Sequence, residues 1–389
     1  MKILNVFYNM DPVSGGGAAE RTFQMSRYLV RTGAECVVLT TDVGMTPERQ
    51  EALAGVEVVA LPYFNRRFYI PRFSSLRRMK NLVESVDVIH LMGHWTAINV
   101  LTYLFARRLG TPYVVCPAGS LLIFGRSKWL KRLFRWLIGA RIVREAEGHI
   151  AISPNEIPQF GTYGVEADRV TVIPNGIDPE DFVSKDASGF RDRYDLGDRP
   201  IVLFVGRLSP EKGPDLLLDA FWRAGGERVD DYLLVFAGPD GGMLSKLRAT
   251  AERRGLKDRV RFLGFVGGAA KSDAYHAADL LVIPSRREAM SIVVLEAGAA
   301  GTPVLLTDQC GFDEVAEIGG GRVVPASAEG LEEGLTAILD NPEELGEMGD
   351  RLRRFTEAGF TWDSIADRHL DLYASILGTR KPGKGQAGG

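Results

Sequence analysis

Two carboxylates eight positions apart lie in the part of this sequence whose residue types and spacing best suit chemistry. Glu288 follows an apolar run at 280–283 that ends at Pro284, and Glu296 lies in a helical pattern that begins near residue 291. Eight helical residues span about 12 Å. The two carboxylates of a glycosidase lie roughly 5–9.5 Å apart, so this spacing is too wide for that chemistry. It suits a long ligand held at both ends, although two solvated glutamates on a helix face would show the same spacing.

Two cations form the second candidate site. Arg207 and Lys212 follow an apolar run at 201–205 and precede Pro214, which fits the first position of a helix. An arginine can donate two parallel hydrogen bonds to phosphate oxygens, and a lysine acts as a point charge. The pair can therefore hold a diphosphate without a metal ion. Because the sequence contains no Asp-x-Asp, we expect a reaction that needs no metal and no cofactor.

A glycine loop between the first predicted strand, 2–9, and a predicted helix, 18–31, forms the third candidate site. The loop contains Gly15, Gly16 and Gly17. Free backbone amides and the helix dipole together favour an anion at such a position. The third glycine of the dinucleotide-binding fingerprint would fall on Glu20, which counts against a nicotinamide enzyme.

Apolar runs that alternate with helical patterns must position these residues. The predicted strands are 2–9, 36–40, 56–61, 86–90, 113–116, 149–152, 170–173, 201–205, 233–237, 261–263, 280–283 and 303–306. This alternation predicts an α/β fold with parallel sheets. A chain of 389 residues favours two domains. No run of 18 apolar residues occurs, so we expect no membrane span.

Positive charge is concentrated in one region. Residues 60–144 contain 15 Lys and Arg and two acidic residues, which gives 15 − 2 = +13 in a chain whose net charge is −3. Within 126–144 an apolar face alternates with basic residues, and that face contains Trp129, Leu133, Trp136 and Leu137. We expect a helix lying on an anionic membrane surface, with a core-packed helix as the alternative. No nucleic-acid-binding motif accompanies the charge.

The remaining reactive residues predict no metal site. Cys36, Cys116 and Cys310 lie far apart among apolar residues, which favours free thiols in a reducing cytosol. His90 and His94 flank the end of a predicted strand without a nearby acidic ligand. The N-terminus predicts a first strand instead of a signal peptide. We therefore expect a cytoplasmic protein that is peripheral on the inner face of the membrane.

Several motifs recur in the order and spacing of one known family. They are Gly206-Arg-Leu with Lys212-Gly, Pro284-Ser with Glu288 and Glu296, Pro174-Asn-Gly-Ile-Asp178, and Phe360-Thr-Trp-Asp363. Together they resemble the large retaining glycosyltransferase family 4. The resemblance implies the GT-B fold: two Rossmann-like domains facing across a deep cleft, with a C-terminal helix crossing back to the N-terminal domain. The implied domains are 1–178 with the helix 360–378, then 179–359, and a disordered tail at 379–389.

The resemblance also implies roles for individual residues. The residue matching Glu296 holds the ribose of the donor, and the residue matching Glu288 contacts hydroxyls of the donor sugar. Arg207 and Lys212 match the pair that neutralises the leaving diphosphate, so Arg207, Lys212 and Glu288 are the expected catalytic residues. The expected donor-binding residues are Gly15, Gly16, Gly17, Gly206, Phe265, Val266 and Glu296.

Two positions depart from the family pattern. The usual Glu-Gly-Phe-Gly is Glu288-Ala-Met-Ser291 here, and the usual His-Gly after the fifth strand is Ala118-Gly119-Ser120. The first departure leaves the identity of the donor sugar open. The second means that no catalytic residue is assigned in the N-terminal domain.

The implied function is retaining transfer of a sugar, of the hexosyltransferase type, from a nucleoside diphosphate sugar to an acceptor hydroxyl. The basic segment 126–144 favours a lipid-linked saccharide as acceptor, as in the synthesis of a cell-surface polysaccharide or glycolipid. Two alternatives stay open. A sugar-nucleotide epimerase of the same fold would need no acceptor, and a non-catalytic adaptor on the membrane surface would bind no nucleotide.

Overall fold

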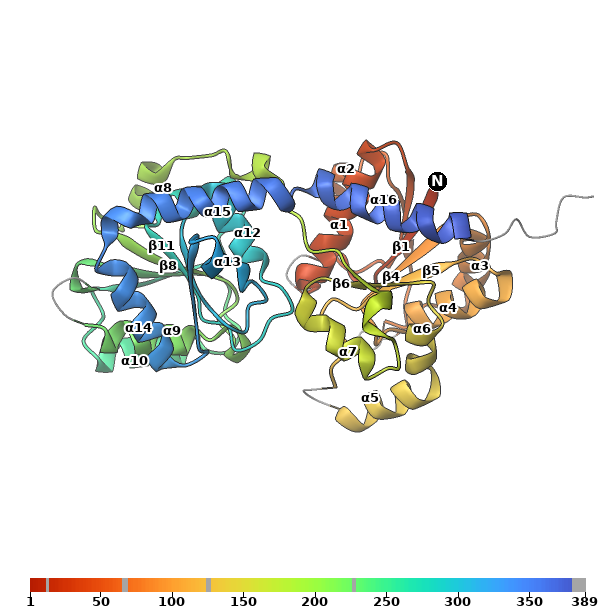
Figure 1. The fold of residues 1–389 in the computed structure, drawn as a ribbon, viewed down its shortest axis with the longest axis horizontal. Helices are drawn as coiled ribbons and strands as arrows, with labels where there is room; N and C mark the ends of the chain where they lie inside the picture. Colours follow the sequence, from red (N-terminus) through yellow and green to blue (C-terminus); the bar gives the residue numbers. More distant parts are fainter. Residues whose placement is uncertain (12–13, 65–68, 124–126, 226–228, 380–389) are drawn as a thin grey trace, which may run out of the picture. The chain divides into compact units, whose positions relative to one another are not determined.

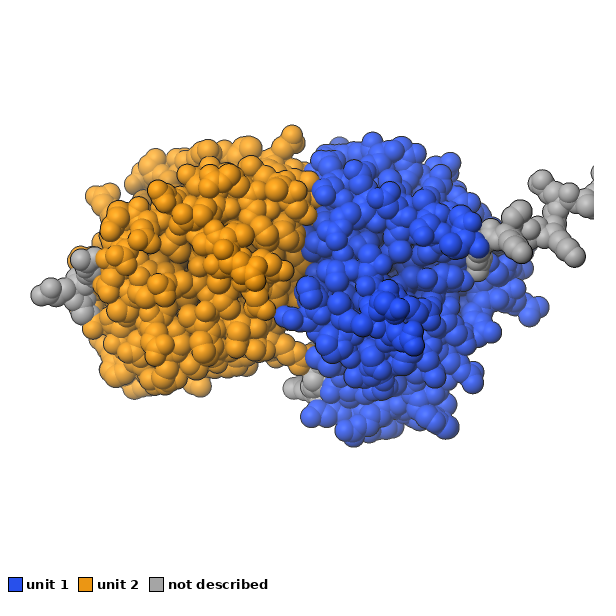
Figure 2. Space-filling view, viewed as in Figure 1, with its two compact units in different colours: residues 1–175, 362–389 blue, residues 176–361 orange. Residues whose placement is uncertain are grey.

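The computed structural model describes residues 1–11, 14–64, 69–123, 127–225 and 229–379 of the chain. The chain folds into two compact units, residues 1–175 with 362–389 and residues 176–361 (Figures 1 and 2). From residue 380 onward, the predicted tail lies outside the described residues.

The first unit is built on a parallel seven-stranded sheet in the order β3-β2-β1-β4-β5-β6-β7. Its strands are β1 Lys2–Val6, β2 Glu35–Thr41, β3 Glu57–Leu61, β4 Val88–Met92, β5 Tyr113–Cys116, β6 Gly148–Ala151 and β7 Val170–Val172. In the central register, Ile3 of β1 pairs with Cys36 on one side and with Val88 on the other. The prediction that β4 ends at His90 is wrong: the apolar pattern continues through Leu91 and Met92, so His90 is buried inside the strand.

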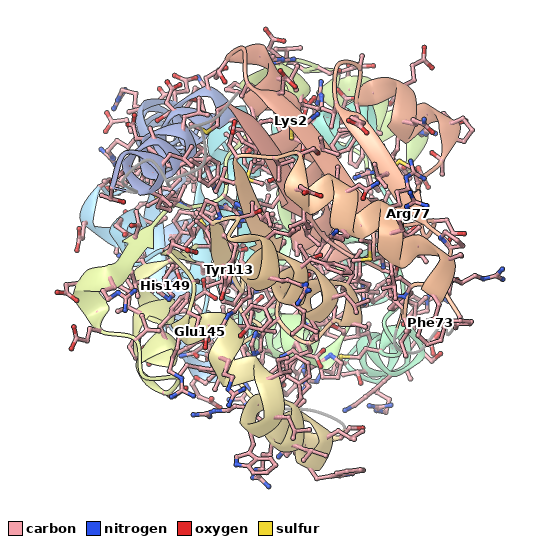
Figure 3. All side chains as sticks on the ribbon, turned by 90° about the vertical axis from the view of Figure 1, so that its right-hand side faces the viewer. Lys2, Phe73, Arg77, Tyr113, Glu145 and His149 are labelled. Atoms are coloured by element: carbon pink, nitrogen blue, oxygen red, sulfur yellow. The ribbon has the colours of Figure 1, made fainter. Side chains whose placement is uncertain are left out.

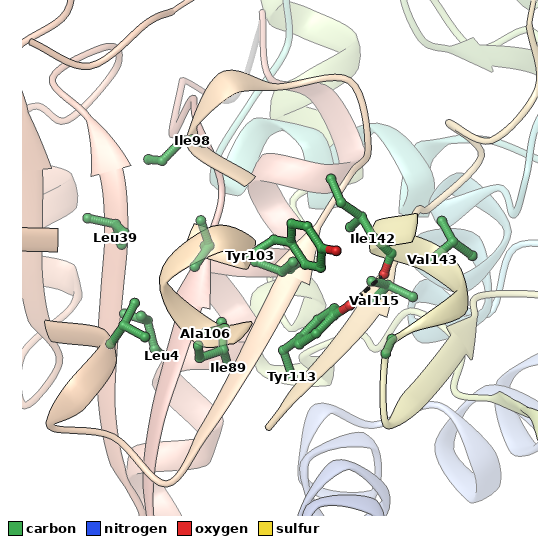
Figure 4. Close-up of a cluster of buried hydrophobic side chains, with 14 of the residues drawn as sticks. Leu4, Leu39, Ile89, Ile98, Tyr103, Ala106, Tyr113, Val115, Ile142 and Val143 are labelled. Carbon is green, nitrogen blue, oxygen red and sulfur yellow. Dashed lines mark hydrogen bonds between the residues drawn. The ribbon is translucent and has the colours of Figure 1, made fainter. Parts of the chain in front are cut away.

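Helices cover both faces of this sheet. They are α1 Gly16–Arg31, α2 Pro47–Ala52, α3 Leu76–Glu84, α4 Ala97–Leu109, α5 Lys128–Phe134, the π-helical turn η2 Arg135–Gly139, α6 Ala140–Arg144, α7 Ile157–Gly161 and α16 Trp362–Thr379, with the 3-10 turns η1 Phe73–Ser75, η3 Pro154–Glu156 and η4 Ala167–Arg169. One face of the sheet packs with α3, α4 and α6 into a continuous apolar core. Figure 4 shows this core, in which the Tyr113 hydroxyl donates to the Ile142 carbonyl oxygen at 2.9 Å.

The C-terminal helix α16 belongs to the first unit although the second unit precedes it in sequence. Its buried face follows helical spacing: Trp362, Ile365, Ala366, His369, Tyr373 and Ile376. The Tyr373 hydroxyl is 2.6 Å from His90 Nδ1, which ties the helix to the centre of the sheet. Arg21 of α1 donates to His369 at 3.3 Å and to the Pro174 carbonyl at 2.6 Å. Buried hydrogen bonds therefore seat α16 on the first sheet.

The second unit is built on a parallel six-stranded sheet in the order β10-β9-β8-β11-β12-β13. Its strands are β8 Ile201–Val205, β9 Leu233–Ala237, β10 Val260–Gly264, β11 Leu280–Ile283, β12 Val304–Thr307 and β13 Gly321–Val324. The last of these was not predicted. Most are short runs of Val, Ile, Leu and Phe because they are buried on both faces.

The helices of the second unit are α8 Ala187–Arg193, α9 Pro214–Arg223, α10 Leu244–Arg253, α11 Ala269–Ala277, α12 Ile292–Ala300, α13 Glu314–Glu317, α14 Ala328–Leu339 and α15 Leu345–Gly359, with the 3-10 turns η5 Pro179–Phe182, η6 Pro210–Lys212, η7 Val229–Asp231 and η8 Pro342–Glu344. Helix α12 is apolar around most of its circumference because it is buried. It ends where Gly301 adopts a left-handed conformation, φ +78°. Glu296 is therefore an acidic residue inside a buried helix, which requires local partners.

Candidate functional site

The order of the second sheet brings two predicted site loops together. Strands β8 and β11 are neighbours although two strands separate them in sequence, so the strand order reverses between them. Ligands of open α/β sheets bind at such a point, beyond the carboxyl ends of the strands. The loop after β8 contributes Lys212 and the loop after β11 contributes Glu288, and Lys212 Nζ lies 2.9 Å from Glu288 Oε1.

Glu288 is held in place by its own loop and by the next one. The Ser285 hydroxyl donates to Glu288 Oε1, and the Glu288 amide donates to the Gln309 carbonyl oxygen at 2.9 Å. Only 9% of the Glu288 side chain is exposed, against 34% of Lys212. The carboxylate is therefore a fixed group, and the lysine is the more accessible member of the pair.

A second ion pair fixes the two loops to each other. The Arg286 guanidinium donates to both carboxylate oxygens of Asp215, each at 2.8 Å, and its backbone amide donates to the Glu211 carbonyl oxygen at 2.8 Å. The hydrogen bonds to Asp215 raise the pKa of the Arg286 guanidinium. The sequence did not predict this contact, because Arg286 and Asp215 are charged residues of two segments that are far apart in sequence and neither belongs to a recognised motif.

Glu296 has two partners from helix α11. Lys271 Nζ lies 2.7 Å from Glu296 Oε1, and the Tyr275 hydroxyl donates to Glu296 Oε2 at 2.6 Å. Burial, together with the nearby Glu296 charge, raises the pKa of Tyr275 well above its ordinary value. The i, i+4 spacing of Lys271 and Tyr275 was a possible sequence signal, since it places both on one helix face.

The other predicted donor-binding residues of the second unit differ in exposure. Gly206, with φ +150°, follows β8, and Arg207 is exposed on the same loop. After β10, Phe265 has 68% of its surface exposed, whereas Val266 is buried. Phe265 is accessible to a flat ligand such as a base, and Val266 can only support the loop from beneath.

The glycine loop lies at the equivalent place in the first unit, where strand order reverses between β1 and β4. The predicted start of its helix at Ala18 is wrong: α1 begins at Gly16, so Gly16 and Gly17 form its first turn. A Cβ at Gly15 would lie 2.7 Å from the Asp11 carbonyl oxygen. The loop therefore has no room for a side chain at Gly15, and it leads directly into a helix N-terminus.

His94 follows β4 at the same end of this sheet. Its ring packs against three aromatic rings, Trp95, Phe134 and Tyr163, at centroid distances of 4.6, 5.5 and 5.3 Å. Burial, with a smaller effect of the positive Arg135, lowers the pKa of His94 to about 3. His94 is therefore a neutral aromatic core residue at neutral pH. Throughout the described ranges, no group of three or more His, Cys, Asp or Glu side chains gathers as a metal site would require.

The basic segment forms one continuous helical stretch from Lys128 to Arg144, as predicted, but a π-helical turn interrupts it. Position 126 lies outside the described residues. The predicted apolar face of the segment is exposed to solvent, so the core-packed alternative does not hold for its side chains. Their exposed fractions are 66% for Trp129, 43% for Leu133, 79% for Trp136 and 55% for Leu137. We call these four residues the apolar stripe. No helix among the described residues is long and apolar enough to cross a membrane.

Comparison with known proteins identifies the family. Residues 15–181 match Glycosyltransferase Family 4, and residues 190–357 match Glycosyl transferases group 1. The chain therefore belongs to glycosyltransferase family 4, and its two parallel-sheet units are those of the GT-B fold.

Two curated relatives are named for related reactions. The chain is 32% identical to D-inositol 3-phosphate glycosyltransferase 2 of Catenulispora acidiphila, over 93% of this chain and 90% of that one. It is 33% identical to D-inositol 3-phosphate glycosyltransferase of Gordonia bronchialis, over 75% of this chain but only 66% of the relative. Among solved structures, HepE of Anabaena in complex with UDP and glucose superposes with a TM-score of 0.78 at 21% identity, over 96% of this chain and 100% of that one.

Proposed function

We propose that this protein transfers a sugar, with retention, from a nucleoside diphosphate sugar to an acceptor hydroxyl. The observation that carries the proposal is the 2.9 Å contact between Lys212 and Glu288 at the reversal point of the second sheet. A cation and a carboxylate that follow adjacent strands can bind the diphosphate and the sugar of one donor. The lysine would bind the diphosphate, and the carboxylate would accept hydrogen bonds from the sugar hydroxyls. Family membership and a solved relative with UDP and glucose support this assignment.

In the ligand-free protein, Glu288 neutralises Lys212. When a donor diphosphate arrives, Lys212 exchanges its partner for the phosphate oxygens, and Glu288 becomes available to accept hydrogen bonds from the sugar. As the bond between the anomeric carbon and the diphosphate breaks, the acceptor oxygen bonds to that carbon, the acceptor proton passes to a diphosphate oxygen, and negative charge grows on the leaving diphosphate. Lys212 and Arg207 stabilise that charge, and this attraction is worth more in a partly desolvated site than in water. The step needs no metal ion for this charge.

Glu296 is assigned to the ribose of the donor. Each carboxylate oxygen has two lone pairs, so Oε1 and Oε2 can accept from ribose hydroxyls while they keep Lys271 and Tyr275. Those two partners fix the carboxylate before the ligand arrives, which lowers the entropy lost on binding. Phe265 is assigned to the base, and the amides of the Gly15–Gly17 loop are assigned to a phosphate.

The acceptor is proposed to be a saccharide linked to a lipid, which the protein reaches by lying on the cytoplasmic membrane surface. The apolar stripe supports this proposal because large exposed apolar side chains flanked by cations suit an anionic interface. Sedimentation with vesicles that contain anionic lipid tests it. Wild-type protein that stays in the supernatant at low salt contradicts the membrane assignment and leaves the donor assignment standing.

A thermal-shift screen of nucleoside diphosphates, followed by incubation with the matching radiolabelled sugar donor, tests the function itself. We expect one nucleoside diphosphate to raise the Tm, and sugar to appear on an added lipid-linked acceptor. Conversion of the donor to its epimer without acceptor would show an epimerase. No shift with any nucleotide would favour an adaptor and contradict the proposal.

A further inference from the structure

A groove of about 430 Å³ lies on the first unit, along the helical stretch that runs from α5 through η2 to α6. Its lining combines cations with apolar surface: Ile123, Arg132, Arg135, Trp136, Ala140 and Arg144. In Figure 3, several nitrogen-tipped side chains project near the helix below Glu145, where this stretch lies. Of its lining residues, Trp136 also belongs to the apolar stripe, and no role assigned above concerns the groove as a binding site.

Few acidic residues neighbour the groove in sequence, and Glu145, which directly follows Arg144, pairs with Arg107. From residue 88 to residue 144 the chain contains nine Lys and Arg and no Asp or Glu. In the part of the chain that the structure describes, Arg132, Arg135 and Arg144 form no ion pair. Three guanidinium groups around one concave surface raise the local concentration of anions.

Two of the three arginines already make hydrogen bonds, and Arg144 donates from Nε to the Ala140 carbonyl oxygen at 3.2 Å. Arg135 donates from Nη2 to the Thr162 carbonyl oxygen, and its guanidinium lies 4.5 Å from the centre of the Tyr163 ring. Its remaining N–H groups stay available, since a guanidinium has five. Arg132 and Arg144 are exposed at two other places along the groove. A ligand would therefore find Arg135 and Arg144 already held by hydrogen bonds, and Arg132 exposed along the groove.

The π-helical turn explains how the groove forms. Its helical residues Arg132, Trp136, Ala140 and Arg144 are spaced by four. In a regular α-helix, residues four apart drift by about 40° per step, so three steps would carry Arg144 well around the helix. A π-helical turn contains more residues and reduces that drift, and such turns are frequent at functional sites. Gly139 also lets the turn approach the core, because a Cβ there would lie 3.0 Å from His94 Nε2.

We propose that this groove binds the diphosphate group by which the saccharide of a lipid-linked acceptor is joined to its hydrocarbon chain. Its polar half offers three guanidinium forks, which match the several free oxygens and the double negative charge of such a group. A phosphodiester headgroup has two free oxygens and one negative charge, so it uses the site less well. Its apolar half, Ile123, Trp136 and Ala140, shares Trp136 with the apolar stripe, where the hydrocarbon chain would enter the bilayer.

This inference rests on the proposed membrane-bound acceptor and deepens it. The groove selects the phosphate-bearing end of a lipid, whereas the apolar stripe and its flanking cations bind membranes in general. The two effects are separable because general attraction follows surface charge alone. Binding in the groove depends on the charge and the free oxygens of each phosphate group, even when the total surface charge is held constant.

Sedimentation of the full chain with two kinds of vesicle tests the proposal. Both contain phosphatidylcholine; one adds phosphatidic acid, a phosphomonoester, and the other adds phosphatidylglycerol, a phosphodiester. The proportions are adjusted until both have the same zeta potential. We expect wild-type protein to bind the phosphatidic acid vesicles at least about fivefold more tightly, since one additional charge-assisted contact is worth about that factor or more. Inorganic pyrophosphate in solution should reduce this preference.

Variants separate the groove from general charge. Arg132→Ala with Arg144→Ala should abolish the preference, whereas Arg141→Ala, on the same helix but outside the groove lining, should keep it. Equal binding of wild-type protein to the two vesicles, or an unchanged preference in the double variant, would overturn the proposal. The nucleoside diphosphate thermal shift is measured on the same samples. If no nucleoside diphosphate raises the Tm, the proposed glycosyltransferase function is contradicted, whereas the vesicle preference still decides whether the groove binds the lipid phosphate.

Discussion

A Cβ atom added at Gly213 would lie 2.0 Å from the carbonyl oxygen of Pro284. Gly213 ends the loop that contains Lys212, and Pro284 begins the loop that contains Glu288. The backbone of one loop therefore rests on the backbone of the other, and only glycine allows this approach. Gly213 also has φ +65°, a conformation that other residues rarely adopt.

Replacing Gly213 with alanine should separate the two loops and destabilise the second unit. The left-handed conformation costs roughly 1–2 kcal/mol for a residue with a side chain, and overpacking adds about 1–3 kcal/mol. Gly255→Ala is the matched control, because Gly255 has φ +69° with nothing within 4 Å of an added Cβ. Urea unfolding should show a larger loss for Gly213→Ala than for Gly255→Ala. Equal losses would mean that the contact with Pro284 is unimportant.

Lys212→Ala should lower kcat strongly and affect nucleoside diphosphate binding less. Removing one preorganised group that stabilises transition-state charge lowers kcat by about 10²–10³-fold in other enzymes. Lys257→Ala, which removes an exposed lysine of the same unit, is the control. The measurement is initial rate against donor concentration, which separates kcat from KM. A Lys212→Ala enzyme with wild-type kcat would contradict the role assigned to this lysine.

Most strands of the two sheets, and the loops that contain Lys212 and Glu288, were predictable from sequence because each depends on a local pattern. Buried parallel strands are short apolar runs, and loops after neighbouring strands meet at one edge. Which strands are neighbours is a tertiary property. The resemblance implied that Lys212 and Glu288 act on one donor, but neither their contact nor that of Arg286 with Asp215 was predicted. Strand β13 was missed because glycine and arginine interrupt its apolar run.

Two other features depend on three-dimensional packing in the same way. The partners of Glu296 lie on α11, and their i, i+4 spacing gives a shared face without saying what that face contacts. His90 was placed at a strand end because a histidine is polar. In the structure it is inside β4, where Tyr373 of the distant helix α16 provides its hydrogen bond. A polar residue in an apolar run cannot be assigned until its partner is known.

Tyr275→Phe should destabilise the second unit, because it removes the hydrogen bond that the hydroxyl donates to buried Glu296. Hydrogen bonds to charged groups contribute about 1.5–3 kcal/mol. For a unit of this size each kcal/mol lowers the Tm by roughly 2–4 °C. Tyr194→Phe is the control, because Tyr194 contacts Phe190 and Arg193 through its ring. Differential scanning calorimetry should show a lower Tm for Tyr275→Phe alone, and equal Tm values would exclude a stabilising hydrogen bond.

Chelation should leave the transferase activity unchanged. If Arg207 and Lys212 stabilise the negative charge of the leaving diphosphate, no divalent cation is required for that step. Activity is measured after dialysis against EDTA and again after addition of Mg²⁺ or Mn²⁺. An enzyme that loses activity on dialysis and regains it with one of these ions would contradict the charge assignment.

The first unit should lose stability as the pH falls below about 6.5, and His94 should account for part of that loss. Its pKa is about 3 in the folded protein against an ordinary value of 6.5, so the unfolded chain takes up a proton over this interval and the folded protein does not. Each such histidine weakens folding by about 1.4 kcal/mol per pH unit within the interval. His94→Phe preserves the ring contacts and removes the titrating group, whose Nε2 has no hydrogen-bond partner among the described residues. Urea unfolding of both proteins between pH 7.5 and pH 5 should give a flatter dependence for His94→Phe, whereas parallel curves would show that the pKa of His94 is the same in the folded and unfolded states.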